Sequence, residues 1–235
     1  MRALLYRQGY EITTANWQGT DAPPTFLEIL HADLIAPMYD HADLETSIAS
    51  NSLGATQPWA DIHFGERVGG EPLNPPPSHT MWLKDTDKYL SENQEAFSHS
   101  YPERMWSPSI DGIRFKTGNL GDAVTLLKND PTTRQCYVPM WFPEDITAAN
   151  QGERVPCSFG WHFMLRDDEL HCSYHMRSCD VVRHLHNDLY FANCLTQWMI
   201  DQSGIDAEPG YLHFSSTSLH CFANDRYPLG RLCGI

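Results

Sequence analysis

One continuous stretch decides how this chain folds: Arg154 to Asn193, RVPCSFGWHFMLRDDELHCSYHMRSCDVVRHLHNDLYFAN. Apolar and polar residues alternate over Ser158 to Leu165 and again over Glu169 to Met176, which predicts two antiparallel strands joined by a short acidic turn. A helix is expected from about Asn187 to Ser203, because the apolar spacing changes there and Gly204 follows as a C-cap. Strands followed directly by a helix favour an α+β fold.

The same stretch carries chemically active side chains. Cys157 follows Pro156 at the start of the first strand, and Arg177, Asp180 and Asp188 come within the next turns of chain. Strand pairing folds this span back on itself, so we expect these groups to face one cavity. A thiol becomes a nucleophile when a nearby cation lowers its pKa, and Arg177 is the candidate cation. The alternative for Cys157 is a buried structural cysteine.

The flanking sequence is expected to add helices and strands to one domain that covers residues 1–235. Helices are predicted for Phe26 to Met38, Ser78 to about Ser91 and Gly121 to Asn129. Strands are predicted within Pro58 to Arg67 and for Gln135 to Met140 and Tyr211 to Phe222, and Ser98 to Asp111 is expected to be a loop.

Composition excludes several classes of function. The chain has 235 residues and a formal charge of −14, which argues against a stable complex with nucleic acid or an anionic membrane. Seven cysteines, an odd number, and no leader sequence favour reduced thiols and a cytoplasmic location over a disulfide framework. No apolar run is long enough for a membrane span. The histidine spacing lacks a paired ligand pattern, so no metal site is expected.

Several motifs in order resemble one enzyme family. They are the Pro156-Cys157 pair, Arg177-Ser178-Cys179-Asp180, an upstream Leu127 to Pro131 followed by Arg134, and a downstream Ser218 to Phe222. From about Asp122 to Asp225 the chain resembles thymidylate synthase and the related pyrimidine nucleotide hydroxymethylases. The resemblance implies a mixed β-sheet that forms a homodimer interface, and a one-carbon transfer from methylenetetrahydrofolate to C5 of a pyrimidine nucleotide.

The resemblance also assigns roles to single residues. The catalytic candidates are Cys157, Tyr101, His79 and Asp180. The substrate-binding candidates are Arg134, Arg177, Ser178, Asp188 and His220. Arg134 is expected to reach the partner's site, and Tyr101 to help remove the C5 proton. His79 stands where the family has a glutamate, so either His79 serves as the acid–base group or the glutamate lies elsewhere.

The position eight residues after Asp180 reads the base in this family. Thymidylate synthases have Asn there and cytidylate hydroxymethylases have Asp; this chain has Asp188, although a one-residue slip would place Asn187 there instead. We therefore expect a homodimeric deoxycytidylate (or cytidylate) 5-hydroxymethyltransferase. The alternatives are C5-methylation of dCMP or dUMP, and a nucleotide-binding relative without turnover. The second alternative is motivated by His79 and by Gln135, which stands where the family usually has a second arginine.

Overall fold

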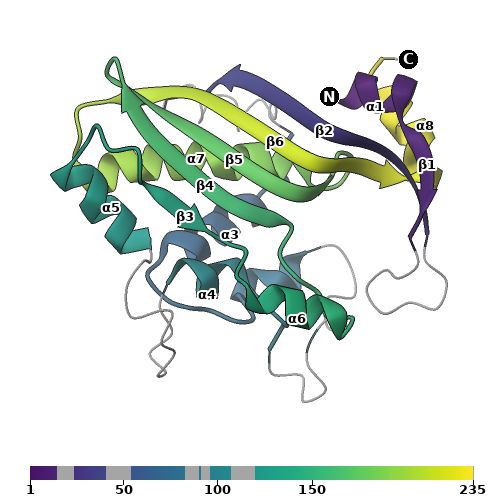
Figure 1. Cartoon of the computed structure of the whole chain (residues 1–235), viewed down its shortest axis with the longest axis horizontal. Helices are drawn as coiled ribbons and strands as arrows, with labels where there is room; N and C mark the ends of the chain where they lie inside the picture. Colours follow the sequence, from purple (N-terminus) through teal and green to yellow (C-terminus); the bar gives the residue numbers. More distant parts are fainter. Residues whose placement is uncertain (15–23, 41–53, 83–89, 91–95, 107–119, 235) are drawn as a thin grey trace.

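The computed structural model describes residues 1–14, 24–40, 54–82, 90, 96–106 and 120–234. Its described strands form a six-stranded sheet in the order β1-β2-β6-β5-β4-β3. The strands are β1 Tyr10–Thr13, β2 Thr25–Pro37, β3 Tyr137–Pro139, β4 Ser158–Arg166, β5 Glu169–Asp180 and β6 Glu208–Phe222. Only the β5–β6 pair among them is parallel, so the sheet is mixed (Figure 1).

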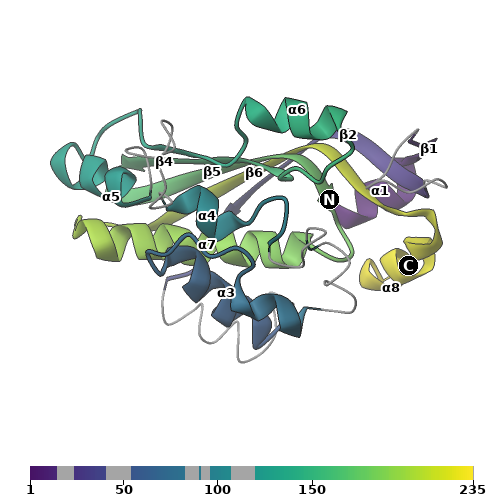
Figure 2. The ribbon, with the colours of Figure 1, turned by 90° about the horizontal axis from the view of Figure 1, so that it is seen from below.

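Helices cover one face of this sheet more fully than the other. The helices are α1 Arg2–Gln8, α3 Trp59–Val68, α4 Tyr101–Met105, α5 Leu120–Asn129, α6 Glu144–Asn150, α7 Leu185–Ser203 and α8 Arg226–Leu232. Figure 2 shows α7 running along one face of the sheet, with α3 beyond it, whereas α6 lies on the opposite side. This arrangement is the α+β fold with a mixed sheet that the sequence predicts.

Side-chain alternation across the sheet separates the core from an open face. Val138, Trp161, Tyr174 and Phe214 are register partners on four successive strands, and all four are buried on the α7 side. Their neighbours one residue away point the other way, because successive residues of a strand face opposite sides. The row of Tyr137, His162, Ser173, His213 and Ile35 therefore lies on the open face.

The elements nearest the predicted site follow the sequence closely. Strands β4 and β5 and helices α5 and α7 are confirmed within a few residues of their predicted bounds. Asp167 and Asp168 form the hairpin turn with φ of 50° and 62°, a conformation that Asp adopts more readily than most residues. Gly204 ends α7 in the left-handed conformation, as a C-cap glycine should.

Two predictions in the N-terminal half are wrong, and two others agree with the structure only in part. Thr25–Pro37 is strand β2 rather than a helix, because it pairs along almost its whole length with β6. Trp59–Val68 is helix α3 rather than a strand, with Ala60, His63 and Arg67 on its buried face. Only Pro77–Met81 of the predicted Ser78 helix is helical, as a short 3-10 turn, and most of the remaining segment lies outside the described residues. The Ser98–Asp111 loop contains the short helix α4.

The described residues contain neither a membrane-spanning helix nor a cluster of metal ligands. None of their helices combines the length and apolar character needed to cross a bilayer. Within the same ranges, no group of three or more His, Cys, Asp or Glu residues is placed to hold a metal ion.

Candidate active site

Cys157 lies directly before β4 and next to Arg177 of the neighbouring strand β5. The Arg177 backbone N–H donates to the Cys157 carbonyl at 2.8 Å, and its guanidinium Nη2 lies 3.8 Å from the sulfur. The guanidinium also donates to the carbonyls of Pro156 and Val155, at 2.7 and 3.0 Å, which fixes its position. Burial raises the pKa of the Cys157 thiol, whereas Arg177 lowers it. The cation is therefore in place to stabilise a thiolate.

A β-bulge in β4 follows the cysteine. The register with β5 shifts between Ser158 and Gly160, and Gly160 has a φ of 148°. A Cβ at Gly160 would lie 2.4 Å from the Val138 carbonyl oxygen, so a larger residue is excluded. The bulge turns the start of β4 relative to the rest of the sheet, and bulges of this kind re-aim side chains next to active sites.

Asn187 and Asp188 at the start of α7 point to different partners. Asn187 is buried; its side-chain oxygen accepts from Thr56 N at 2.8 Å and its amide donates to the Thr56 hydroxyl at 3.3 Å. Asp188, one residue and about 100° further around the helix, accepts from the Cys179 thiol at 3.7 Å and from the Tyr174 hydroxyl. Asp188, rather than Asn187, therefore faces the strand that carries Arg177.

Burial makes the Asp188 carboxyl an unusually weak acid. It raises the pKa from 3.8 to about 7, against the opposing effects of Arg67 and of the hydrogen bonds from Cys179 and Tyr174. The group therefore titrates near neutral pH, as an acid or base must if it is to take and release a proton there.

Tyr101 opens helix α4 and belongs to the same cluster. A capping box formed by Ser100 and Glu103 begins this helix. The Tyr101 hydroxyl lies close to the backbone of Ser158, next to Cys157. Burial and the neighbouring Cys157 raise the pKa of Tyr101 far above the neutral range, so its phenol stays protonated.

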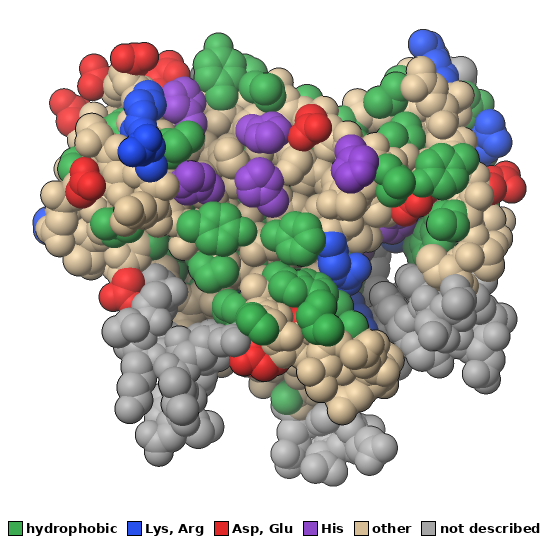
Figure 3. Space-filling model, in the orientation of Figure 1, with side chains coloured by type: hydrophobic (Ala, Val, Ile, Leu, Met, Phe, Trp, Pro, Cys, Tyr) green, Lys and Arg blue, Asp and Glu red, His purple; other side chains and the backbone are tan. Residues whose placement is uncertain are grey.

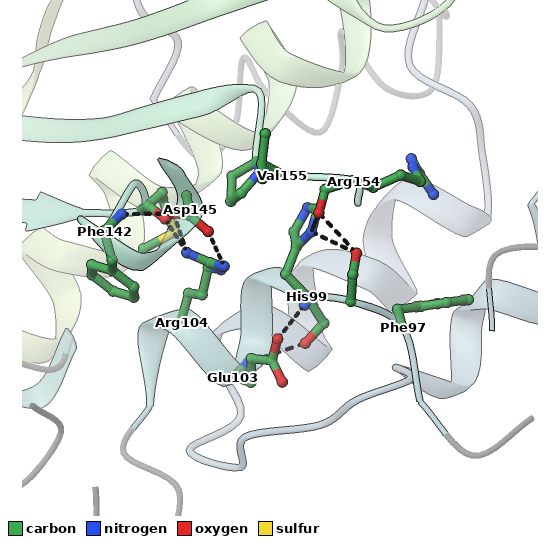
Figure 4. Close-up of polar contacts among 12 residues, drawn as sticks. Phe97, His99, Glu103, Arg104, Phe142, Asp145, Arg154 and Val155 are labelled. Atoms are coloured by element: carbon green, nitrogen blue, oxygen red, sulfur yellow. Dashed lines mark hydrogen bonds and ion pairs between the residues drawn. The ribbon is translucent and has the colours of Figure 1, made fainter. Parts of the chain in front are cut away.

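A network of hydrogen bonds holds α4 and α6 against the segment that leads to Cys157 (Figure 4). Arg104 of α4 binds Asp145 of α6 with two hydrogen bonds, of 2.9 and 2.8 Å, and donates to the Met140 carbonyl at 2.8 Å. Ser98 and His99 bind the Arg154 carbonyl at 2.9 and 3.2 Å, three residues before the cysteine. Arg104 is thus a structural brace for the site.

Asp180 and His220 are register partners at the ends of β5 and β6. One oxygen of Asp180 accepts from the backbone of Val182 and Arg183, at 2.9 and 3.0 Å, and the other accepts from the Arg183 guanidinium at 3.0 Å. Asp180 therefore caps the turn before α7. Ser178 lies 3.5 Å from His220, so these two polar side chains form a pair beside Arg177.

The described contacts of two predicted site residues, His79 and Arg134, are with other parts of the chain. His79 bonds to the Pro76 carbonyl at 2.9 Å and packs edge-on against Phe97 at 5.4 Å between ring centroids. Arg134 is exposed just before β3, and its carbonyl accepts from His162 at 3.0 Å. Its exposed side chain is available to a partner subunit.

The sequence did not predict a role for three residues near the cluster. Arg67 is only 5% exposed and lies on the buried face of α3, and Tyr174 lies on the core side of β5. Glu66 accepts from both the backbone and the hydroxyl of Ser78, at 2.6 and 2.5 Å. The helical spacing of Ala60, His63 and Arg67 was the available signal, but this segment was interpreted as a strand.

Comparisons with known proteins agree with this geometry. The thymidylate synthase family model matches residues 81–231. A protein of Methanosarcina mazei named "Putative thymidylate synthase" is 28% identical over 157 residues, which cover 63% of this chain and 67% of the relative. A protein of the same name from Methanococcoides burtonii also shares 28% identity over 157 residues, with the same two coverages.

A solved structure shares the fold. The thermostable thymidylate synthase A of Bacillus subtilis superposes with a TM-score of 0.69 at 15% sequence identity, covering 97% of this chain and 79% of that one. The family model spans more than half of the chain, and the cysteine–arginine pair lies inside the matched residues. This chain belongs to the thymidylate synthase family.

Proposed function

We propose that this enzyme transfers a one-carbon unit to C5 of deoxycytidylate, or of cytidylate, and releases the 5-hydroxymethyl nucleotide. Family membership supports one-carbon transfer to C5 of a pyrimidine nucleotide, and methylenetetrahydrofolate is the donor that members use. The choice of base rests on Asp188, whose titratable carboxyl lies on the cluster side of α7. An amide at this position would favour uracil.

The choice of cytosine follows from its hydrogen-bonding groups. Cytosine presents a 4-amino donor and an N3 acceptor, whereas uracil presents an O4 acceptor and an N3–H donor. The Asp188 carboxyl group accepts from the amine, and in its protonated form it also donates its O–H to N3. O4 of uracil would face the carboxylate, so two buried acceptors would oppose each other.

Cys157 is the proposed nucleophile. Its thiolate, stabilised by Arg177 at 3.8 Å, forms a bond to C6 while the C5=C6 electron pair moves toward C4 and N3. Asp188 supplies the proton that N3 takes up. C5 is then nucleophilic and would bond to the methylene carbon that methylenetetrahydrofolate supplies. Tetrahydrofolate would leave as the C5 proton is lost, water would add to the resulting exocyclic methylene, and re-formation of the C5=C6 bond would expel the Cys157 thiolate. Tyr101 stays protonated, so it would remove the C5 proton by relay through its hydroxyl or an oriented water.

The remaining polar side chains fit the sugar and phosphate. His220 and Ser178 lie beside each other at the ends of β5 and β6, where a sugar hydroxyl or phosphate oxygen can be bound. Arg177 adds positive charge there, and Arg134 of a second subunit would add more. We assign these four side chains to nucleotide binding.

An aromatic platform next to Asp180 suits the flat pterin of the folate. Trp82 stacks on His184 with 5.5 Å between ring centroids and an interplanar angle of 16°, and packs against Trp59 at 4.1 Å. His184 is exposed and precedes α7, the helix that carries Asp188. Flat heterocycles stack on such rings.

A homodimer would cover the open face of the sheet. Figure 3 shows histidine side chains gathered over this face, with hydrophobic side chains beside them. Large apolar side chains of the sheet are exposed, with fractions of 70% for Ile35, 51% for Tyr211 and 44% for Tyr137. Such a patch marks an interaction surface. Arg134 is exposed near Tyr137, so a second chain on this face would bring another copy of this cation close.

Mass spectrometry of the products tests this proposal. The enzyme is incubated with methylenetetrahydrofolate and either dCMP, CMP or dUMP, and the expected product is the 5-hydroxymethyl form of the cytidylate. A gain of a methyl group would instead favour the C5-methylation alternative, and no reaction of any nucleotide would favour a non-catalytic relative. A 5-fluoro nucleotide with the folate should leave a covalent adduct on Cys157, and an adduct on another cysteine would contradict the assignment.

A further inference from the structure

A largely buried carboxylate near the end of α3 holds the turn that leads to Trp82. Glu66 accepts from the backbone N–H of Ser78 at 2.6 Å through one oxygen, and from the Ser78 hydroxyl at 2.5 Å through the other. Ser78 belongs to the 3-10 turn Pro77–Met81 and is only 2% exposed. The two hydrogen bonds therefore join α3 to a segment 12 residues further along the chain.

His63, one turn earlier on α3, completes this network. Its Nδ1 lies 3.2 Å from the Glu66 carboxylate and 3.0 Å from the Ser78 hydroxyl oxygen. Burial, together with the charge of Arg67, lowers the pKa of His63 to about 4, so the imidazole is neutral at pH 7. A carboxylate can only accept, and the single hydroxyl hydrogen of Ser78 is directed to Glu66, so Nδ1 carries the hydrogen of the ring. His63 is therefore a third donor to the same cluster of oxygens.

These donors keep Glu66 ionised although it is largely buried. The side chains of Glu66 and His63 are each only 10% exposed. Burial raises the pKa of Glu66, but the hydrogen bonds from His63 and Ser78 outweigh it, and the pKa is lowered overall. Hydrogen bonds to an ionised carboxylate are about twice as strong as those between neutral groups. The three side chains thus form one rigid unit that is built from two segments of the chain.

Ring contacts extend this unit to Trp82. The His63 ring stacks on Trp59 with 4.8 Å between centroids and an interplanar angle of 16°. Trp59 packs against Trp82, which in turn stacks on His184. The backbone supplies a second connection, because Trp82 directly follows the 3-10 turn and its N–H donates to the His79 carbonyl at 3.2 Å. Trp82 is therefore held both by its own chain and by the rings of α3.

We propose that Glu66 is a positioning residue for folate binding, which holds the ring of Trp82 in the orientation on which the pterin stacks. This inference rests on the proposed function, which assigns the rings of Trp82 and His184 to the folate. A ring that is free to move must be ordered when the ligand binds, and ordering one side chain costs roughly twofold to tenfold in affinity. The side chains assigned to the nucleotide lie on other elements, β5, β6 and α7, so loss of Glu66 should spare nucleotide binding.

Binding of tetrahydrofolate, which carries the same pterin, to the dCMP-loaded protein tests this role without turnover. In isothermal titration calorimetry, Glu66→Ala should raise the dissociation constant of tetrahydrofolate by about fivefold to tenfold and change that of dCMP by less than about twofold. Glu66→Gln should retain most of the affinity, because its amide can still accept from the Ser78 N–H and donate to the hydroxyl oxygen. Glu208→Ala, at an exposed position on β6, is the matched control.

A double variant separates positioning from a general loss of stability. Trp82→Leu removes the ring and should weaken tetrahydrofolate at least as much as Glu66→Ala does. In the Trp82→Leu background, Glu66→Ala should have no further effect, because Glu66 acts through this ring. If Glu66→Ala does not fold, Ser78→Ala, which keeps the backbone N–H, takes its place in the same comparison.

Three results would overturn the role of Glu66. They are additive losses in the double variant, an equal loss of dCMP and tetrahydrofolate affinity in Glu66→Ala, and native affinity for tetrahydrofolate in Trp82→Leu. Failure of the proposed function gives a different result: the protein would show the expected pattern of binding, yet form no 5-hydroxymethyl nucleotide with methylenetetrahydrofolate present. A native protein that binds dCMP but no tetrahydrofolate would overturn both.

Discussion

The substitution Asp188→Asn should convert the base preference of this enzyme. The amide keeps the shape of the carboxyl, donates to O4 of uracil and accepts from its N3–H, so it suits uracil. In that same orientation the amide would set its N–H₂ against the 4-amine of cytosine and its oxygen against N3. The substitution therefore makes uracil the matched base and cytosine the mismatched one. It does so at a position of α7 that faces Tyr174 and Cys179.

The size of the effect follows from one mispaired buried group. Leaving such a group unsatisfied costs about 1–3 kcal/mol, which corresponds to roughly tenfold to hundredfold in kcat/KM. The variant should lose at least about tenfold for dCMP and gain at least about tenfold for dUMP. The ratio of the two kcat/KM values should then fall by about hundredfold or more.

Steady-state kinetics with both nucleotides at pH 7, close to the Asp188 pKa of about 7, measure this ratio. Asp201→Asn is the matched control, because it makes the same change on an exposed residue of α7. If Asp188→Asn keeps the native ratio, or lowers kcat/KM for both nucleotides alike, Asp188 does not read the base. A native enzyme that prefers dUMP at pH 7 would contradict the assignment of Asp188 to the base.

The pH dependence of thermal unfolding gives an independent test of the raised pKa of Asp188. Its folded pKa of about 7 lies above the reference value of 3.8, so the folded protein binds the proton more tightly than the unfolded chain. The contribution of Asp188 to stability therefore falls as pH rises from about 4 to 7, by at most about 4 kcal/mol, and is constant above that range. Asp188→Asn should remove this part of the pH dependence, and an unchanged dependence would show that the pKa is not raised.

Three other substitutions test the rest of the site. Cys157→Ser should abolish turnover and leave nucleotide binding within a fewfold of native, measured by calorimetry, because the hydroxyl is a far weaker nucleophile. Mixing inactive Cys157→Ser and inactive Arg134→Ala chains should restore part of the activity if Arg134 acts in the partner's site; a monomer at micromolar concentration would refute this. Arg104→Met should lower the free energy of unfolding by about 3–5 kcal/mol because it leaves Asp145 buried and unpaired, whereas Arg104→Met/Asp145→Leu should recover much of that loss.

The sequence was sufficient to predict the strands and helix of the C-terminal half because the residues that determine them lie close together in the chain. Alternation over β4 and β5, two turn residues that tolerate positive φ, and a helix ended by Gly204 each act within a few residues. The cysteine and the arginine that the structure brings to 3.8 Å lie on one strand pair, so their proximity followed from the hairpin alone.

The predictions for the N-terminal half failed because its strands and helices are stabilised by residues that are distant in the sequence. The segment Thr25–Pro37 has apolar residues that fit a helix as well as a strand, and His31 in its middle has a φ of 56°, which interrupts strict alternation. Pairing with β6, almost two hundred residues later, makes it a strand. Helix α3 has no side-chain cap at its N-terminus, so packing of Ala60 and His63 rather than local sequence stabilises it.

Arg67 shows why such errors matter for function as well as for fold. As a strand residue it had no defined neighbour, and an arginine of unknown surroundings is most simply taken to be exposed. Helix α3 instead turns it inward, between the rings of Tyr101 and Phe191. The motif that carries Asp188 could be found in the sequence, but the buried cation packed against the same helix comes from another element. The contact of Arg67 with Phe191 joins α3 to α7, the helix that carries Asp188, and a comparison of motifs around position 188 alone would not reveal it.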